Sequence, residues 1–127
     1  MNEELDRLTD SIIGAAISVH RELGPGLLES AYEACLAYEL KQRNLQVDSQ
    51  KPLPIIYRGV SLDCGYRLDL LMEDKVILEL KTVERLHAIH EAQLLSYLKI
   101  ARKNVGLLIN FRSLRVTDSI KRIVYNY

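Results

Sequence analysis

The sequence predicts an α/β fold, a mixed β-sheet flanked by α-helices in the order ααβββββαββ. Three observations support this prediction. Apolar residues recur at helical spacing up to about residue 43, the pattern changes to short strands over 45–81, and helical spacing returns over 87–102 before a final apolar run. A chain of 127 residues is long enough to bury a core. We therefore expect one domain over residues 1–127.

Two amphipathic helices open the chain. The first is predicted over residues 3–23, and Gly24-Pro25-Gly26 ends it, because glycine suits the left-handed cap and proline prevents continuation. The second is predicted over residues 28–43. The residues expected to be buried are Leu5, Leu8, Ile12, Ala15, Ala16, Val19 and Leu23 in the first helix, and Tyr32, Cys35, Leu36 and Leu40 in the second.

The middle of the chain is predicted to form strands. A strand begins at residues 47–50, and Pro52 and Pro54 indicate an edge or irregular segment, because proline cannot donate to a central ladder. Residues 55–57 and 60–62 form a hairpin around Arg58-Gly59.

A second hairpin is expected from residues 66–72 and 76–81, and the continuous apolar run at its second strand predicts cover on both faces. A helix over 87–102 then leads to a strand at 105–110, which we expect to run parallel to 76–81. The last strand is predicted at 120–125. The helix contributes as candidate core residues Ile89, Leu94, Leu95, Leu98 and Ala101.

Composition and charge limit the function classes. The formal net charge is zero, but residues 1–33 carry seven acids and two bases, whereas residues 99–127 carry seven bases and one acid. The basic segment is compatible with a phosphate-facing surface or a solvated face. The first residues are acidic, and no apolar run reaches the length of a membrane span, so we expect a cytoplasmic protein without a membrane partner. Cys35 and Cys64 are expected to be free thiols.

Three charged residues gather in the second hairpin. Glu79 and Lys81 share one strand face, with Leu78 and Leu80 on the other. If Glu73-Asp74 form a two-residue turn, Asp69 lies opposite Leu78 and diagonal to Glu79; one more turn residue places it directly opposite Glu79. Opposed carboxylates in apolar surroundings repel each other, and a cation between them would remove the conflict. Asp69, Glu79 and the Leu80 carbonyl are oxygen ligands suited to Mg²⁺.

Asp69 followed by Glu79-Leu80-Lys81 resembles the core motif of the PD-(D/E)XK nuclease superfamily. The segment Gly26-Leu27-Leu28-Glu29-Ser30-Ala31-Tyr32 resembles the signature of the GxxExxY family, which is assigned to that superfamily. The likeness continues over residues 19–25, 90–98 and 106–111, so that it covers nearly the whole chain. The resemblance implies a restriction-endonuclease-like mixed β-sheet flanked by α-helices.

The resemblance also implies further site residues. Glu29 on an early helix would complete the acidic metal site, although the helix dipole alone would favour an acid there. Gln93 on the helix after the Glu-x-Lys strand would be catalytic, and Tyr97 accessory, although residues four apart on a helix touch in any case. His20 and His90 are accessory candidates for a metal or general-base role, and a packing role is the alternative for each.

The function implied by the resemblance is phosphodiester cleavage in nucleic acid with Mg²⁺ or Mn²⁺ as the cofactor. Asp69, Glu79, Lys81, Glu29 and Gln93 would be the catalytic residues. Nucleic acid is the expected partner, with DNA preferred over RNA, and a homodimer would suit a duplex substrate. The alternative is a non-catalytic module that binds nucleic acid or a protein partner and retains the nuclease fold. A third reading is a domain whose acids are only structural.

Overall fold

The computed structural model describes residues 2–127, which form three α-helices, one short 3-10 helix and seven strands. Five strands build the main sheet in the order β1-β4-β5-β6-β7, and β2 and β3 pair separately. The helices are α1 (Glu3–Leu23), α2 (Glu29–Gln42), α3 (Ala88–Ala101) and the 3-10 helix η1 (Val116–Ser119). The strands are β1 (Val47–Pro52), β2 (Ile55–Tyr57), β3 (Val60–Leu62), β4 (Arg67–Met72), β5 (Val76–Lys81), β6 (Val105–Asn110) and β7 (Ile120–Val124).

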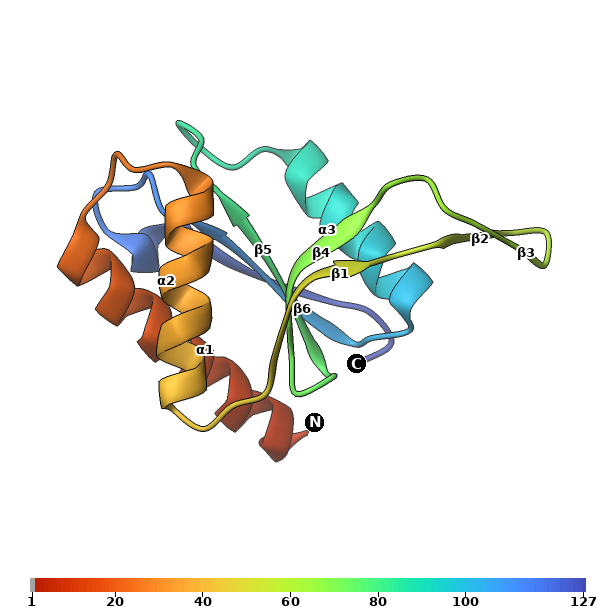
Figure 1. Cartoon of the computed structure of the whole chain (residues 1–127), viewed down its shortest axis with the longest axis horizontal. Coiled ribbons are helices and arrows are strands. Elements are labelled where there is room, and N and C mark those ends of the chain that lie inside the picture. Colours follow the sequence, from red (N-terminus) through yellow and green to blue (C-terminus); the bar gives the residue numbers. More distant parts are fainter. Residues whose placement is uncertain (1) are drawn as a thin grey trace.

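The sheet lies between two helical layers, with α1 and α2 on one face and α3 on the other (Figure 1). Each face has its own apolar core. The first core joins α1 and α2 to residues of β4, β5 and β6 that include Leu70, Leu78 and Leu107. The second joins α3 to residues of the same strands that include Leu71, Ile77 and Leu108. The alternation along each strand therefore serves both layers, and the predicted mixed sheet flanked by helices is confirmed.

Two predicted core positions are wrong. Cys35 in α2 is exposed, because the buried stripe of that helix runs through Tyr32, Leu36 and Leu40 and leaves Cys35 on its border. Ile89 in the first turn of α3 is 71% exposed, because the buried residues of this helix begin only at Leu94. Both cysteines are free thiols, as predicted.

The prolines mark an edge of the sheet, as predicted. β1 is an edge strand that pairs with β4 alone, and Pro52 is its last residue. The β2–β3 hairpin follows and projects away from the sheet (Figure 1). Its side chains Ile56, Tyr57 and Val60 are all exposed.

The crossover through α3 makes β5 and β6 parallel over the full length of both strands, also as predicted. α3 approaches β6 closely, because Gly106 has no side chain at the contact: a Cβ there would lie 2.9 Å from a methyl carbon of Leu94. The backbone of Phe111 continues this pairing by donating a hydrogen bond to the carbonyl of Lys81 (2.9 Å).

The β4–β5 connection decides between the two predicted registers. Glu73 and Asp74 both adopt left-handed conformations, and the N–H of Lys75 closes the turn on the carbonyl of Met72. Lys75 then remains as an extra residue, since Met72 pairs with Val76. The two-residue register is therefore wrong. The longer connection places Asp69 in line with Glu79 across the hairpin.

Within residues 2–127, no helix combines the length and the apolar character that crossing a membrane requires.

Candidate active site

The β4–β5 ladder stops where the acidic residues begin. Regular pairing ends at Leu70 opposite Leu78. Beyond that point the N–H of Asp69 donates to Oε2 of Glu79 (2.9 Å), and the N–H of Leu80 donates to Oδ2 of Asp69 (2.8 Å). Each carboxylate thus bonds to the backbone of the opposite strand, in the place where a ladder hydrogen bond would lie. This reciprocal bonding holds the two carboxylates next to each other.

The same point marks a change of face in β4. Leu70 and Met72 belong to the core under α1 and α2, and strict alternation would place Leu68 with them. Leu68 instead belongs to the core under α3. Asp69 therefore lies where the strand turns over. This position lets its carboxylate reach both β5 and the residues on the α2 side.

Glu79 is the most strongly perturbed of these acids. It is only 5% exposed, and burial, followed by the charge of Asp69, raises its pKa to about 8. The hydrogen bond from Asp69 N–H and the charge of Lys81 oppose that rise. Burial also raises the pKa of Asp69, against the hydrogen bond from Leu80 and the charge of Lys81. At both carboxylates, burial therefore outweighs the opposing effect of Lys81.

α2 brings a third predicted acid to the same place. Burial, and then the charge of Asp69, raises the pKa of Glu29. The loop before α2 is held by Tyr32, whose hydroxyl donates to the carbonyl of Gly24 and accepts from the N–H of Leu27 (3.1 Å). The Tyr32 ring stacks on Phe111 at 4.6 Å between centroids. Gly26 has a φ of 117°, a conformation that favours glycine. The glycine and tyrosine of the Gly26–Tyr32 segment thus have a structural reason, and they fix the helix start that carries Glu29.

Two residues near Asp69 were not predicted. Glu33 lies one turn after Glu29, and burial followed by the charge of Asp69 raises its pKa. Gln50 lies between the two acids: its Nε2 donates to Oε1 of Glu33 (2.7 Å) and more weakly to Oδ1 of Asp69 (3.5 Å). The i, i+4 spacing of the two α2 acids could have indicated Glu33. The position of Gln50 near Asp69 could not be predicted from local spacing, because it depends on the pairing of β1 with β4.

Lys81 supplies the positive charge of the site. Its positive charge opposes the rise in the pKa values of Asp69, Glu79 and Glu29. Its Nζ donates to Oε1 of Gln93 in α3 (3.4 Å). Tyr97 lies one turn beyond Gln93. Burial, and then the charge of Glu79, raises its pKa. The predicted residues from β4, β5, α2 and α3 therefore surround one point at the open end of the hairpin.

Asn110 holds the backbone just beyond Lys81, and sequence reasoning did not single it out. Its Oδ1 accepts from the N–H groups of Val83 (3.1 Å) and Arg112 (3.2 Å), and its Nδ2 donates to the carbonyl of Val83 (2.8 Å). The side chain is 1% exposed. An asparagine that ends a buried apolar strand is the signal that could have indicated this role.

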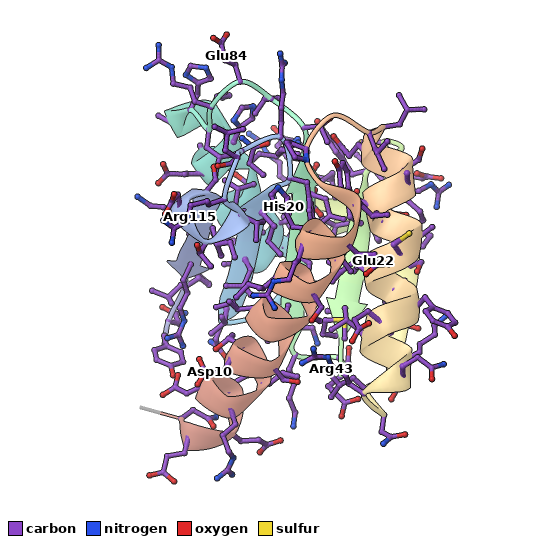
Figure 2. All side chains as sticks on the ribbon, turned by 90° about the vertical axis from the view of Figure 1, so that its left-hand side faces the viewer. Asp10, His20, Glu22, Arg43, Glu84 and Arg115 are labelled. Carbon is purple, nitrogen blue, oxygen red and sulfur yellow. The ribbon has the colours of Figure 1, made fainter. Side chains whose placement is uncertain are left out.

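The two accessory histidines lie in different places. His20 points from α1 toward the segment after β6 (Figure 2), where its Nε2 donates to the carbonyl of Ser113 (2.8 Å). Its ring also faces Phe111, so its contacts are those of a packing residue. His90 lies next to Lys81, and its pKa is lowered by burial, then by the charges of Lys81 and His87.

The donor set fits a hydrated divalent cation better than a fully protein-bound one. Within the described residues, no three acidic, histidine or cysteine side chains are grouped closely enough to hold a metal ion. Mg²⁺ is commonly held by one or two carboxylates and keeps several waters. Asp69 and Glu79 supply those two carboxylates, the Leu80 carbonyl is a third oxygen, and Glu29 would act through water. The raised pKa values indicate that the cluster would accept added positive charge.

Comparison with known protein families gives a match over most of the chain. A family model described as the PD-(D/E)XK nuclease superfamily matches residues 6–123. The chain belongs to that superfamily, and its mixed sheet with flanking helices is the restriction-endonuclease-like fold. No curated protein and no solved structure gives a match. The narrower resemblance to GxxExxY proteins stays a prediction.

Proposed function

We propose that this protein is a nuclease that hydrolyses phosphodiester bonds with the help of Mg²⁺ or Mn²⁺. The observation that carries the proposal is the pair of carboxylates at the open end of the β4–β5 hairpin, each bonded to the opposite strand (Asp69 N to Glu79 Oε2, 2.9 Å; Leu80 N to Asp69 Oδ2, 2.8 Å). Membership of the nuclease superfamily supports a nucleic-acid substrate. DNA is the substrate that we favour over RNA.

In this proposal the acids have a shared task. Asp69, Glu79 and the carbonyl of Leu80 would hold the cation, and Glu29 would assist through a water. A bound divalent cation would lower the pKa of a water and neutralise charge on the phosphate. The crossed hydrogen bonds fix the carboxylates before any ligand arrives, so little ordering is left to the binding step.

Lys81 and Gln93 act on the phosphate side. The ammonium group of Lys81 lies beside the carboxylates and is held by Gln93 Oε1 at 3.4 Å. A lysine there attracts the phosphate and stabilises the negative charge that develops on its oxygens during attack. Gln93 positions Lys81, and its amide N–H groups can donate to a water or a phosphate oxygen.

The test is a cleavage assay with single-stranded and duplex DNA and RNA, each with Mg²⁺, with Mn²⁺ and with EDTA. We expect metal-dependent cleavage that falls at least a hundredfold in Glu79→Gln and in Lys81→Ala. Glu22→Gln is the matched control, because this exposed carboxylate of α1 (Figure 2) lies in a groove between α1 and α2 with Ser18 and Tyr38 and not with the site residues. Absence of cleavage of every substrate, or full activity of both site variants, would contradict the proposal.

One observation favours a second candidate, a module that binds nucleic acid without cutting it. The described residues hold no group of three metal-ligating side chains, and two carboxylates with waters give a weaker cation site than three. The same assay separates the two functions when binding is measured beside cleavage. Salt-dependent binding without turnover would identify the binding module. A homodimer that addresses both strands of a duplex remains a prediction.

A further inference from the structure

A cavity adjoins the candidate site, with Lys81, Gln93 and Tyr97 in its lining. It has a volume of about 480 Å³, within the roughly 300–1,000 Å³ that ligand pockets occupy. Four separate parts of the chain form it: the start of β2, the residue before β4, Lys81 at the end of β5 and one face of α3. Most of its lining is apolar or aromatic, with side chains that include Ile55, Tyr66, Ile89, Tyr97 and Ile100.

Two of these side chains are left uncovered by the fold. Tyr66 is 45% exposed and Ile89 is 71% exposed, although both are large and apolar. Tyr66 meets the buried Tyr97 edge-on, with ring centroids 5.9 Å apart and planes at 64°. Single exposed apolar residues are common, but here they converge on one concave site beside a charged residue. This arrangement suits a ligand that has a flat ring and a polar group attached to it.

The charges around the cavity favour a ligand whose ring carries an anionic group. None of the nine residues that line it is acidic, whereas Lys81 and His90 are among them. The Nδ1 of His90 accepts the N–H of His87 (3.0 Å), so the neutral imidazole carries its proton on Nε2, which can donate to a ligand. The charge of Lys81 also acts on the carboxylates Asp69, Glu79 and Glu29. Lys81 therefore stands between the acidic site and the apolar cavity.

We propose that this cavity binds one unstacked base of a single-stranded nucleic acid, with the attached phosphate at Lys81. The inference rests on the proposed function and names its substrate as a single strand or an unpaired end. Aromatic side chains bind bases of any sequence by stacking, since every base has a π-face. A base inside a duplex must first leave its stack and lose its pairing, which is unfavourable. A duplex would therefore fill the cavity less readily.

The experiment measures binding by fluorescence anisotropy in EDTA, so that cleavage does not interfere. Labelled oligothymidine is compared with an abasic strand of the same length, which has the same phosphates but no bases. We expect the wild-type protein to bind oligothymidine about tenfold more tightly than the abasic strand. Tyr66→Ala should remove most of that difference and Ile89→Ala part of it. Tyr38→Ala is the matched control, a 65% exposed tyrosine on α2 that should leave the difference unchanged.

The inference is wrong if both strands bind equally, if neither binds, or if Tyr66→Ala and Ile89→Ala retain the full tenfold difference. Failure of the proposed function gives a different result. Base-dependent binding that depends on Tyr66, together with no cleavage of any substrate, would support the cavity and contradict the nuclease. Cleavage with no base-dependent binding would support the nuclease and contradict the cavity.

Discussion

The two halves of the β4–β5 hairpin are held together in different ways. Near the turn, Leu70, Leu71 and Met72 pair with Leu78, Ile77 and Val76 in a regular ladder, and all six side chains are buried. At the open end, side-chain carboxylates take the place of the ladder bonds. The first half gains stability from apolar burial. The second half buries acids whose pKa values are raised. Adjacent pieces of the same two strands therefore carry stability and chemistry separately.

The largest effect on stability is expected in the regular half. Leu78 is fully buried in the core under α1 and α2. Leu78→Ala should lower the free energy of unfolding by about 2–5 kcal/mol, through lost burial and the cavity left behind. Urea denaturation measures this loss. A change below about 1 kcal/mol would show that this half of the hairpin does not anchor the sheet.

A smaller effect, which depends on pH, is expected at the open end. The pKa of Glu79 is about 8 in the folded protein and 4.5 without perturbation, so between these values the folded state holds a proton that the unfolded chain releases. Without divalent metal, the free energy of unfolding should therefore fall as pH rises from about 4.5 to about 8, by at most about 1.4 kcal/mol per unit. Thermal unfolding across this range measures the fall.

Glu79→Gln should flatten this pH dependence, because the glutamine carbonyl can still accept the N–H of Asp69 but carries no titrating proton. Glu84→Gln is the matched control, since this exposed side chain lies on the loop after β5 and points away from the protein (Figure 2). An identical slope in wild type and Glu79→Gln would mean that Glu79 is not the group that titrates.

The smallest effect is expected at the turn itself. The side chain of Asp74 is 72% exposed and pairs with Lys103 at 3.1 Å, an arrangement that contributes little to stability. Asparagine tolerates the left-handed conformation found there. Asp74→Asn should therefore change the free energy of unfolding by less than about 0.5 kcal/mol in urea denaturation. A loss above about 1.5 kcal/mol would mean that the turn, rather than the ladder, fixes the register.

The order of helices and strands could be predicted from the sequence because the spacing of apolar residues reflects which of them are buried. Those buried residues make up both cores. The register of β4 and β5 could not, because Lys75 becomes an extra residue only when Glu73 and Asp74 adopt left-handed conformations. Neither residue is glycine or asparagine, which are the usual signals for that conformation. The proximity of Asp69 to Glu79 was predictable because both registers bring them near each other.

The rest of the site shows the limit of local patterns. Gln50 reaches Glu33 and Asp69 only because β1 pairs with β4 and α2 packs beside them. Such contacts join segments that are far apart in the sequence and leave no periodic signal. The wrong prediction that Ile89 is buried also came from a local pattern. The first turn of α3 has helical spacing, but it lies before the buried part of the helix.

The central claim is that Asp69 and Glu79 together form a divalent-cation site, and calorimetric titration with Mg²⁺ or Mn²⁺ tests it most directly. At pH 8.5, where more of Glu79 is ionised, wild type should bind one ion, and binding should weaken at pH 6. Asp69→Asn keeps an acceptor for the N–H of Leu80 but removes one charged ligand. The account predicts at least a tenfold loss of affinity in this variant, whereas equal affinity in both proteins would contradict it.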